Sequence, residues 1–238
     1  MRLLIDVGNT RIKWALTRGD EWLCRGALST ERAAELSEQF ADGPAIRGVW
    51  ASNVAGAAVG QALREAIVAD AWHFVTARER QCGVRNGYEQ PAQLGSDRWS
   101  ALIAAWHLVG GRCLVVNCGT ATTVDALSDE GEFLGGLILP GVELMQRSLC
   151  GATAQLEQGP GKYVAFPRNT ADALFSGAVQ ATCGAVERQH ALLDKVGATV
   201  VLSGGAAEVL RERLKLPLRL EDNLVLQGLW LIARETNA

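Results

Sequence analysis

Two short glycine turns in the chain carry residue types that bind phosphate. The first spans Asp6 to Lys13 and joins two apolar runs that are typical of strands. Its backbone N–H groups, with the side chains of Asn9, Thr10 and Lys13, can point at a phosphate. Asp6 adds a carboxylate, a hard oxygen ligand suited to Mg²⁺. Taken alone, the pattern is equally typical of an ordinary hairpin with a surface acid.

The second turn repeats the first at a constant offset in the sequence. Asn117 takes the place of Asp6, and Gly119 takes the place of Gly8. Gly8 and Asn9 tolerate left-handed backbone angles, so the sequence predicts a sharp turn. Two such turns facing each other would clamp a polyphosphate, and phosphoryl transfer needs mainly positioning and charge neutralisation. The alternative is a purely structural repeat. The chain has no GxxxxGK[ST] motif and no GxGxxG motif.

A candidate base, Asp97, follows Gly95 and Ser96 at the start of an apolar helix predicted to run to about residue 109. In a catalytic role Asp97 would accept the proton of a substrate hydroxyl, and Arg98 would bind a carboxylate or steady the transferring phosphoryl group. In a structural role Ser96 would cap the helix and Asp97 would be a first-turn acid favoured by the helix dipole.

Three further positions allow both a ligand and a structural role. Tyr88 lies in a polar loop, where it either packs passively or hydrogen-bonds a substrate. Thr170 is predicted to cap a long helix, and a capping hydroxyl beside a cleft can also face a ligand. The turn at 203–205 ends a strand with two glycines, which permits close approach of a flat group such as adenine or simply forms a strand-to-helix turn.

The elements around these residues fall into two similar halves. The first half follows the pattern β-β-β-α-β-α-β and then the helix to residue 109, which Gly110 and Gly111 end. The second half restarts with strand, glycine turn and strand, and closes with an amphipathic helix from Asp222. We therefore predict an α/β fold of two lobes, 1–110 and 111–238, each a mixed sheet flanked by helices. Ligands are expected between the lobes, where the glycine turns meet.

The composition supports a globular chain and excludes some partners. Its 238 residues are 48% hydrophobic and 21% charged, which allows a sizeable core and argues against disorder. A net charge of −3 gives no broad attraction to nucleic acid or to an anionic membrane, so neither is an expected partner. We recognise no signal peptide, no run long enough to span a bilayer and no CxxC pair, so a cytoplasmic protein with free thiols is expected.

These motifs together resemble the type III pantothenate kinases of the acetate and sugar kinase, Hsc70 and actin superfamily. The run from Asp6 to Thr10 resembles the family's first phosphate motif, and Gly95 to Arg98 resembles its Gly-x-Asp-Arg pantothenate motif. The run from Gly119 to Ala121 is similar to the second phosphate motif, and 135–141 is similar to the Gly-Gly-x-Ile-x-Pro-Gly segment after it. The resemblance covers essentially the whole chain and implies duplicated actin-like, ribonuclease H-like lobes.

The resemblance implies transfer of the ATP γ-phosphate to the primary hydroxyl of pantothenate, the first step of coenzyme A biosynthesis. Asp97 would be the proton acceptor. The residues implied at ATP are Asp6, Val7, Gly8, Asn9, Thr10, Arg11, Ile12, Lys13 and Thr120. The residues implied at pantothenate are Tyr88, Gly95, Ser96, Asp97, Arg98 and Thr170. The family uses Mg²⁺, here near Asp6, and a monovalent cation such as K⁺ or NH₄⁺, and it is homodimeric.

One position departs from the family pattern. The second phosphate motif usually carries an aspartate that ligates the monovalent cation, and this chain has Asn117 there. An amide carbonyl is a weaker cation ligand than a carboxylate, so weak dependence on the monovalent cation is expected. Two other functions fit parts of the pattern: a non-catalytic nucleotide-binding regulatory accessory protein of the same fold, and a kinase for another small hydroxy acid. The intact Asp97-Arg98 pair argues against the accessory protein, since a pure binder needs no base.

Overall fold

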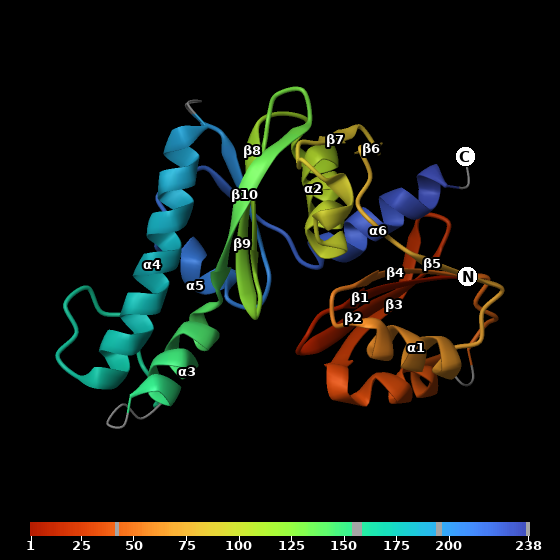
Figure 1. Cartoon of the computed structure of the whole chain (residues 1–238), viewed down its shortest axis with the longest axis horizontal. Coiled ribbons are helices and arrows are strands. Elements are labelled where there is room, and N and C mark those ends of the chain that lie inside the picture. Colours follow the sequence, from red (N-terminus) through yellow and green to blue (C-terminus); the bar gives the residue numbers. More distant parts are fainter. Residues whose placement is uncertain (41–42, 154–158, 194–196, 237–238) are drawn as a thin grey trace. The chain divides into compact units, whose positions relative to one another are not determined.

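The computed structural model describes residues 1–40, 43–153, 159–193 and 197–236 (Figure 1). The chain divides into two compact units, one made of Met1–Leu108 with Asn223–Ala238 and the other of Val109–Asp222. The first boundary falls close to the predicted one. The C-terminal helix differs, because it belongs to the first unit although the sequence pattern had placed it in the second.

The first unit is built on a five-stranded mixed sheet in the order β3-β2-β1-β4-β5. Its strands are β1 (Arg2–Val7), β2 (Arg11–Arg18), β3 (Glu21–Ser29), β4 (Gly48–Asn53) and β5 (Ala71–Phe74). Strand β2 pairs antiparallel with both β1 and β3, whereas β4 runs parallel to β1 and β5 parallel to β4. The parallel pairing matters for the site, because β1 and β4 end at the same edge of the sheet.

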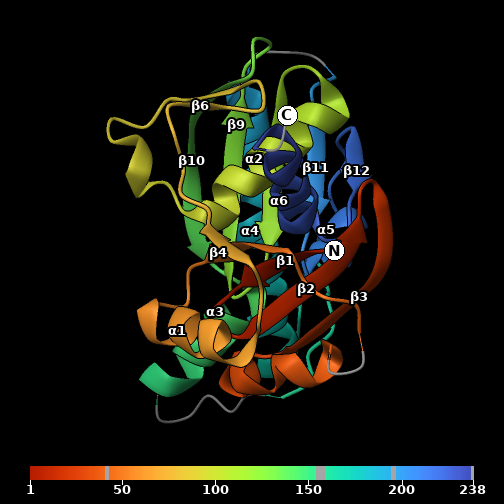
Figure 2. The same ribbon diagram turned by 90° about the vertical axis from the view of Figure 1, so that its right-hand side faces the viewer.

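Helices cover both faces of this first sheet (Figure 2). The 3₁₀ helix η1 (Thr30–Phe40) and α1 (Ala57–Ala66) enclose a core on one face. The C-terminal helix α6 (Leu224–Glu235) contacts β1, β4 and β2. Because a Cβ on Gly228 of α6 would lie 1.9 Å from the carbonyl oxygen of Ser100, only glycine lets α6 cross α2 (Ser96–Val109) this closely. The contacts of α6 with the first sheet explain why the last helix joins the first unit.

A small hairpin and a one-turn helix complete the first unit. Strands β6 (Arg80–Gln81) and β7 (Val84–Asn86) pair antiparallel, and the 3₁₀ helix η2 (Pro91–Gln93) follows them. The indole N–H of Trp99, a fully buried residue of α2, donates a hydrogen bond of 3.0 Å to the side-chain oxygen of Gln81. This bond ties the hairpin to the helix that carries the candidate base.

The second unit repeats the strand order of the first, β10-β9-β8-β11-β12 matching β3-β2-β1-β4-β5. Its elements are β8 (Cys113–Cys118), β9 (Ala121–Leu127), β10 (Glu132–Pro140), α3 (Val142–Ala152), α4 (Thr170–Leu192), β11 (Thr199–Ser203), α5 (Ala207–Arg211) and β12 (Leu218–Leu220). Strands β8, β11 and β12 are parallel, and β8, β9 and β10 are antiparallel. The internal duplication predicted from the two glycine turns is confirmed. No helix among the described residues is long and apolar enough to cross a membrane.

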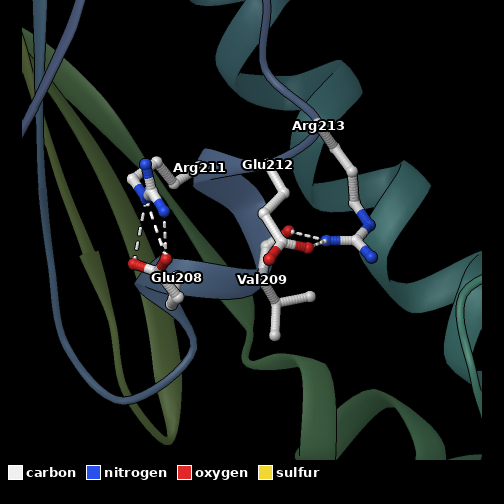
Figure 3. Close-up of polar contacts among 5 residues, drawn as sticks. All are labelled: Glu208, Val209, Arg211, Glu212 and Arg213. Atoms are coloured by element: carbon white, nitrogen blue, oxygen red, sulfur yellow. Dashed lines mark hydrogen bonds and ion pairs between the residues drawn. The ribbon is translucent and has the colours of Figure 1, made fainter.

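The short helix α5 is flanked by ion pairs (Figure 3). Glu208 pairs with Arg211 on the helix, and Glu212 pairs with Arg213 just after it. The Arg213 guanidinium also lies 4.4 Å from the ring centre of Tyr163, a cation–π contact. Exposed ion pairs contribute only about 0–1 kcal/mol each. The helix therefore holds its position mainly through its residues in the core of the second unit.

Candidate active site

Three polar residues form a row across the first sheet. In the strand register Asp6 of β1 lies opposite Lys13 of β2 and beside Ser52 of β4. Residues in register on neighbouring strands project from the same face of a sheet. The neighbours of Asp6 on β1, Ile5 and Val7, project from the opposite face into the core under η1 and α1. The row therefore lies on the face away from that core.

Thr30 fixes the first glycine turn with two hydrogen bonds. The N–H of Gly8 donates to the carbonyl of Arg11 at 3.1 Å. The Thr30 hydroxyl donates to the Gly8 carbonyl at 2.7 Å, and the Thr30 N–H donates to the Thr10 carbonyl at 3.1 Å. The turn is sharp without left-handed angles, since neither Gly8 nor the residue after it has a positive φ. A Cβ on Gly8 would lie 3.1 Å from the Arg11 carbonyl oxygen, so a larger residue would crowd this turn.

Asp6 carries the largest electrostatic perturbation among the candidate residues. Its pKa is raised from 3.8 to about 7, chiefly by burial; the positive charge of Lys13 opposes the rise and the negative charge of Asp97 adds to it. The influence of Asp97 on the Asp6 pKa means that the two carboxyl groups share one region of the first unit. A pair of carboxylates in a desolvated setting is the arrangement that a divalent cation neutralises.

Asp97 lies at the start of α2, where its carboxylate is in close contact with the neighbouring backbone. A Cβ on Gly95 would lie 2.6 Å from Oδ1 of Asp97, so a larger residue there would displace the carboxylate. The same Oδ1 accepts a hydrogen bond of 2.8 Å from the backbone N–H of Arg98. The hydroxyl of Ser96 lies 2.9 Å from the hydroxyl of Ser52, at the end of β4. Ser96 thus makes a contact across the fold instead of the local cap that the sequence allowed.

Tyr88 and Arg98, singled out separately in the sequence, are in contact. The Arg98 guanidinium donates a hydrogen bond of 2.8 Å to the Tyr88 hydroxyl, and its carbon lies 5.6 Å from the ring centre. The loop before them is shaped by Asn86, whose side chain accepts from the Tyr88 N–H and donates to the Pro91 carbonyl, both at 3.1 Å. Sequence reasoning gave Asn86 no role. A buried arginine paired with a tyrosine is suited to holding a planar carboxylate.

The second glycine turn is one residue shorter than the first. Three residues separate the paired Cys118 and Thr122, whereas four separate Val7 and Ile12. The N–H of Gly141 donates to the Thr120 carbonyl at 2.8 Å, and this glycine packs directly on the turn backbone. The second turn is therefore fixed by the Pro-Gly segment that ends β10.

The second unit has a row of residues equivalent to Asp6, Lys13 and Ser52, but all of its side chains are neutral. Thr123 and Ser203 are in register with Asn117, as Lys13 and Ser52 are with Asp6. Only the first unit therefore offers a carboxylate and an ammonium group in the row beside its glycine turn. Gly204, after this row, has φ +97°, and a Cβ there would lie 2.5 Å from the Cys118 carbonyl oxygen. The space beside Gly204 is therefore occupied by the protein's own backbone at Cys118.

Thr170 is the first residue of α4 and is exposed. The helix cap is its neighbour Asn169, whose side-chain oxygen accepts from the Asp172 N–H at 2.9 Å, so the prediction that Thr170 caps the helix was wrong. Thr170 lines a groove of about 760 Å³ between α3 and α4. The groove also contains Leu149 and Arg168, so it offers an apolar wall and a cation.

Comparison with known proteins adds a family to this geometry. The model of the type III pantothenate kinase family matches residues 2–191. The type III pantothenate kinase of Aromatoleum aromaticum is 51% identical over 241 residues and covers all of both chains. The type III pantothenate kinase of Nitrosospira multiformis is 50% identical and covers 99% of this chain and 92% of its own.

Among solved structures the likeness extends to the fold. A protein described as a putative 2-dehydro-3-deoxygalactonokinase, from Sinorhizobium meliloti, aligns with a TM-score of 0.61 at 18% identity, covering 99% of both chains. Sequence identity at this level supports the fold alone. The likeness covers the whole chain and agrees with the repeated strand order of the two sheets, so the predicted fold class is confirmed.

Proposed function

The chain belongs to the type III pantothenate kinase family and is an ATP-dependent kinase; from this premise we propose how its own residues carry out the reaction. The γ-phosphoryl group of ATP passes to the primary hydroxyl of pantothenate, in the first step of coenzyme A biosynthesis. The observation that carries the proposal is the pair of carboxyl groups, Asp6 and Asp97, gathered beside Lys13 in the first unit.

We assign the nucleotide phosphates to the first glycine turn. The run from Asp6 to Lys13 supplies backbone N–H groups and an ammonium group, and Thr120 of the second turn supplies a hydroxyl. Mg²⁺ fits at Asp6, because a desolvated carboxylate with a raised pKa gains from a neighbouring cation. Mg²⁺ commonly uses one or two carboxylates along with phosphate oxygens, so a large cluster of protein ligands is not needed. Asp6 would hold the ion, which would supply positive charge to neutralise the phosphate oxygens.

We assign pantothenate to the residues around α2. Asp97 accepts the proton of the attacking hydroxyl, and Arg98, held by Tyr88, binds the pantothenate carboxylate. Gly95 leaves space at the carboxylate, and Ser96 contacts the substrate only through its main chain because its hydroxyl is turned to Ser52.

The test is a coupled assay of ADP release with ATP and Mg²⁺, run over pantothenate and several other small hydroxy acids. Release that depends on pantothenate supports the proposal. Release with a different hydroxy acid but not with pantothenate would reassign the substrate. ATP binding without release under any condition would favour the accessory-protein function, which the intact Asp97-Arg98 pair and the kinase relatives both disfavour.

We propose that a monovalent cation has little effect on this enzyme. Asn117 stands where the family pattern has a cation-ligating aspartate, and the residues in register with it, Thr123 and Ser203, are also neutral. A neutral set of oxygens holds K⁺ or NH₄⁺ more weakly than a carboxylate does. The measurement is the turnover number in sodium buffer with and without added KCl.

We also propose that the enzyme is a cytoplasmic homodimer. The second unit exposes large apolar side chains next to the Thr170 groove, with Phe166 89% and Leu149 47% exposed. Exposed apolar groups of this size, close together, are typical of a protein interface. A second copy covering the groove would bring Thr170 to a substrate pocket. Sedimentation of Phe166→Asp against Val68→Asp, an equally exposed apolar position in the first unit, tests this: only the first should give monomers.

A further inference from the structure

Ser52 is the one member of the polar row on the first sheet to which the reaction proposed above gives no task. Its side chain is fully buried at the end of β4, in register with Asp6. Its hydroxyl lies 2.9 Å from that of Ser96, which is itself 8% exposed, so the two form a buried pair. A buried hydroxyl without a hydrogen bond is costly, so each serine depends on the other.

The hydroxyl pair joins two elements whose relative position decides the geometry of the reaction. Ser52 belongs to the central part of the sheet that carries Asp6 and the phosphate turn. Ser96 opens α2, one residue before Asp97. A displacement of about 1 Å between reacting groups can cost up to 10²-fold in rate. A single fixed link between sheet and helix start is therefore well placed to control the distance from Asp97 to the bound phosphate.

The other hydrogen bonds at the start of α2 either stay within the helix or run from the Arg98 and Trp99 side chains to Tyr88 and Gln81, which are not on β4. Asp97 accepts from the N–H of the next residue, and the N–H of Trp99 donates to the Gly95 carbonyl at 2.9 Å. The Ser100 hydroxyl donates to the Ser96 carbonyl at 2.8 Å, within the same helix. The Ser52–Ser96 pair joins this first turn to the strand beside Asp6.

We propose that Ser52 is a positioning residue, which acts through Ser96 to hold the Asp97 carboxylate in register with the Asp6 phosphate turn. The proposal rests on the assignment of Asp97 as the base. Because Ser52 is fully buried and its hydroxyl is taken up by Ser96, we expect its removal to lower kcat and leave the KM values for ATP and pantothenate within about twofold.

The first experiment is a kinetic double-mutant cycle with Ser52→Ala and Asp97→Asn. Ser52→Ala should lower kcat about tenfold in the wild-type background and less than about twofold in the Asp97→Asn background. An equal loss in both backgrounds, or no loss in the first, would overturn the proposal. Ser96→Ala should reproduce the loss from the helix side, which keeps the test open if the strand variant fails to fold.

Ser100→Ala is the matched control. Ser100 is also a fully buried serine, on the same helix, and its hydroxyl bonds only within α2. Its removal should lower the melting temperature about as much as Ser52→Ala while kcat stays within about twofold. If both variants lose the same activity, the effect is general destabilisation and the proposal fails.

Hydrogen exchange separates failure of this proposal from failure of the base assignment. Ser52→Ala should speed exchange of the amides at 97–99 about tenfold or more, and Ser100→Ala should change them less. Wild-type turnover in Asp97→Asn would remove the base assignment, and exchange would then show whether the link still orders the helix start. Unchanged exchange in Ser52→Ala would overturn the link itself, whatever the kinetics.

Discussion

Replacing Asp6 by asparagine should stabilise the free protein at alkaline pH while it removes activity. The pKa of this carboxyl group is raised from 3.8 to about 7, chiefly by burial, against the opposing charge of Lys13 and with the added charge of Asp97. A folded-state pKa above the unfolded value favours folding fully only below the unfolded pKa, and that contribution is lost as the pH rises through the folded value. The loss approaches about 4 kcal/mol above pH 7, since one pKa unit corresponds to about 1.4 kcal/mol.

The assay is urea unfolding of the wild-type protein and Asp6→Asn at pH 5, 6, 7 and 8 without nucleotide. The stability advantage of the variant should grow by about 3 kcal/mol between pH 5 and pH 8, because only the wild-type carboxyl ionises over that range. Asp70→Asn, a change at an exposed acid of the same unit, should show no such trend. Parallel pH curves for the wild-type protein and Asp6→Asn would refute the reasoning.

The same pair of proteins tests the metal assignment. Mg²⁺ with ATP should stabilise the wild-type protein at pH 8, because binding to the folded state alone adds stability. Asp6→Asn should gain much less from Mg²⁺ with ATP, and its turnover should fall below detection. Equal stabilisation of both proteins by Mg²⁺ with ATP would place the ion away from Asp6.

Four other changes have defined outcomes. Asp97→Ala should lower turnover by about 10²–10⁴-fold while calorimetry still detects ATP binding; wild-type turnover would remove it from the base role. Added KCl should raise the wild-type rate less than about twofold and should activate Asn117→Asp more strongly. Gly228→Ala should lower the free energy of unfolding by about 1–3 kcal/mol, whereas Gly184→Ala, where the Cβ meets open space, should not lower it. Thr30→Val should raise the KM for ATP about tenfold, because the phosphate turn loses a hydrogen bond; an unchanged KM would count against it.

The sequence predicted those parts of the fold that depend on short stretches of chain. The two glycine turns, the strands beside them and the start of α2 at Ser96 follow from local apolar runs and turn residues. The duplication could be predicted because the two turns share residue types at a constant offset. Its confirmation in the strand order shows that the offset reflects a repeated topology.

The contacts that hold the site together were not predictable, since they join residues far apart in the chain. Thr30 has the features of a helix start, and nothing local shows that its hydroxyl bonds to Gly8. Ser52 is an ordinary small residue at a strand end until the parallel register sets it beside Asp6. The apolar face of α6 was visible in the sequence, but the periodicity does not specify which sheet it covers.

The interrupted first unit sets a condition on how the protein is made. A ribosome releases residues 1–108 long before it releases α6, which buries seven of its twelve residues, many of them against the first sheet and α2. The nascent first unit must therefore wait, with an apolar face uncovered, until the second unit has been synthesised.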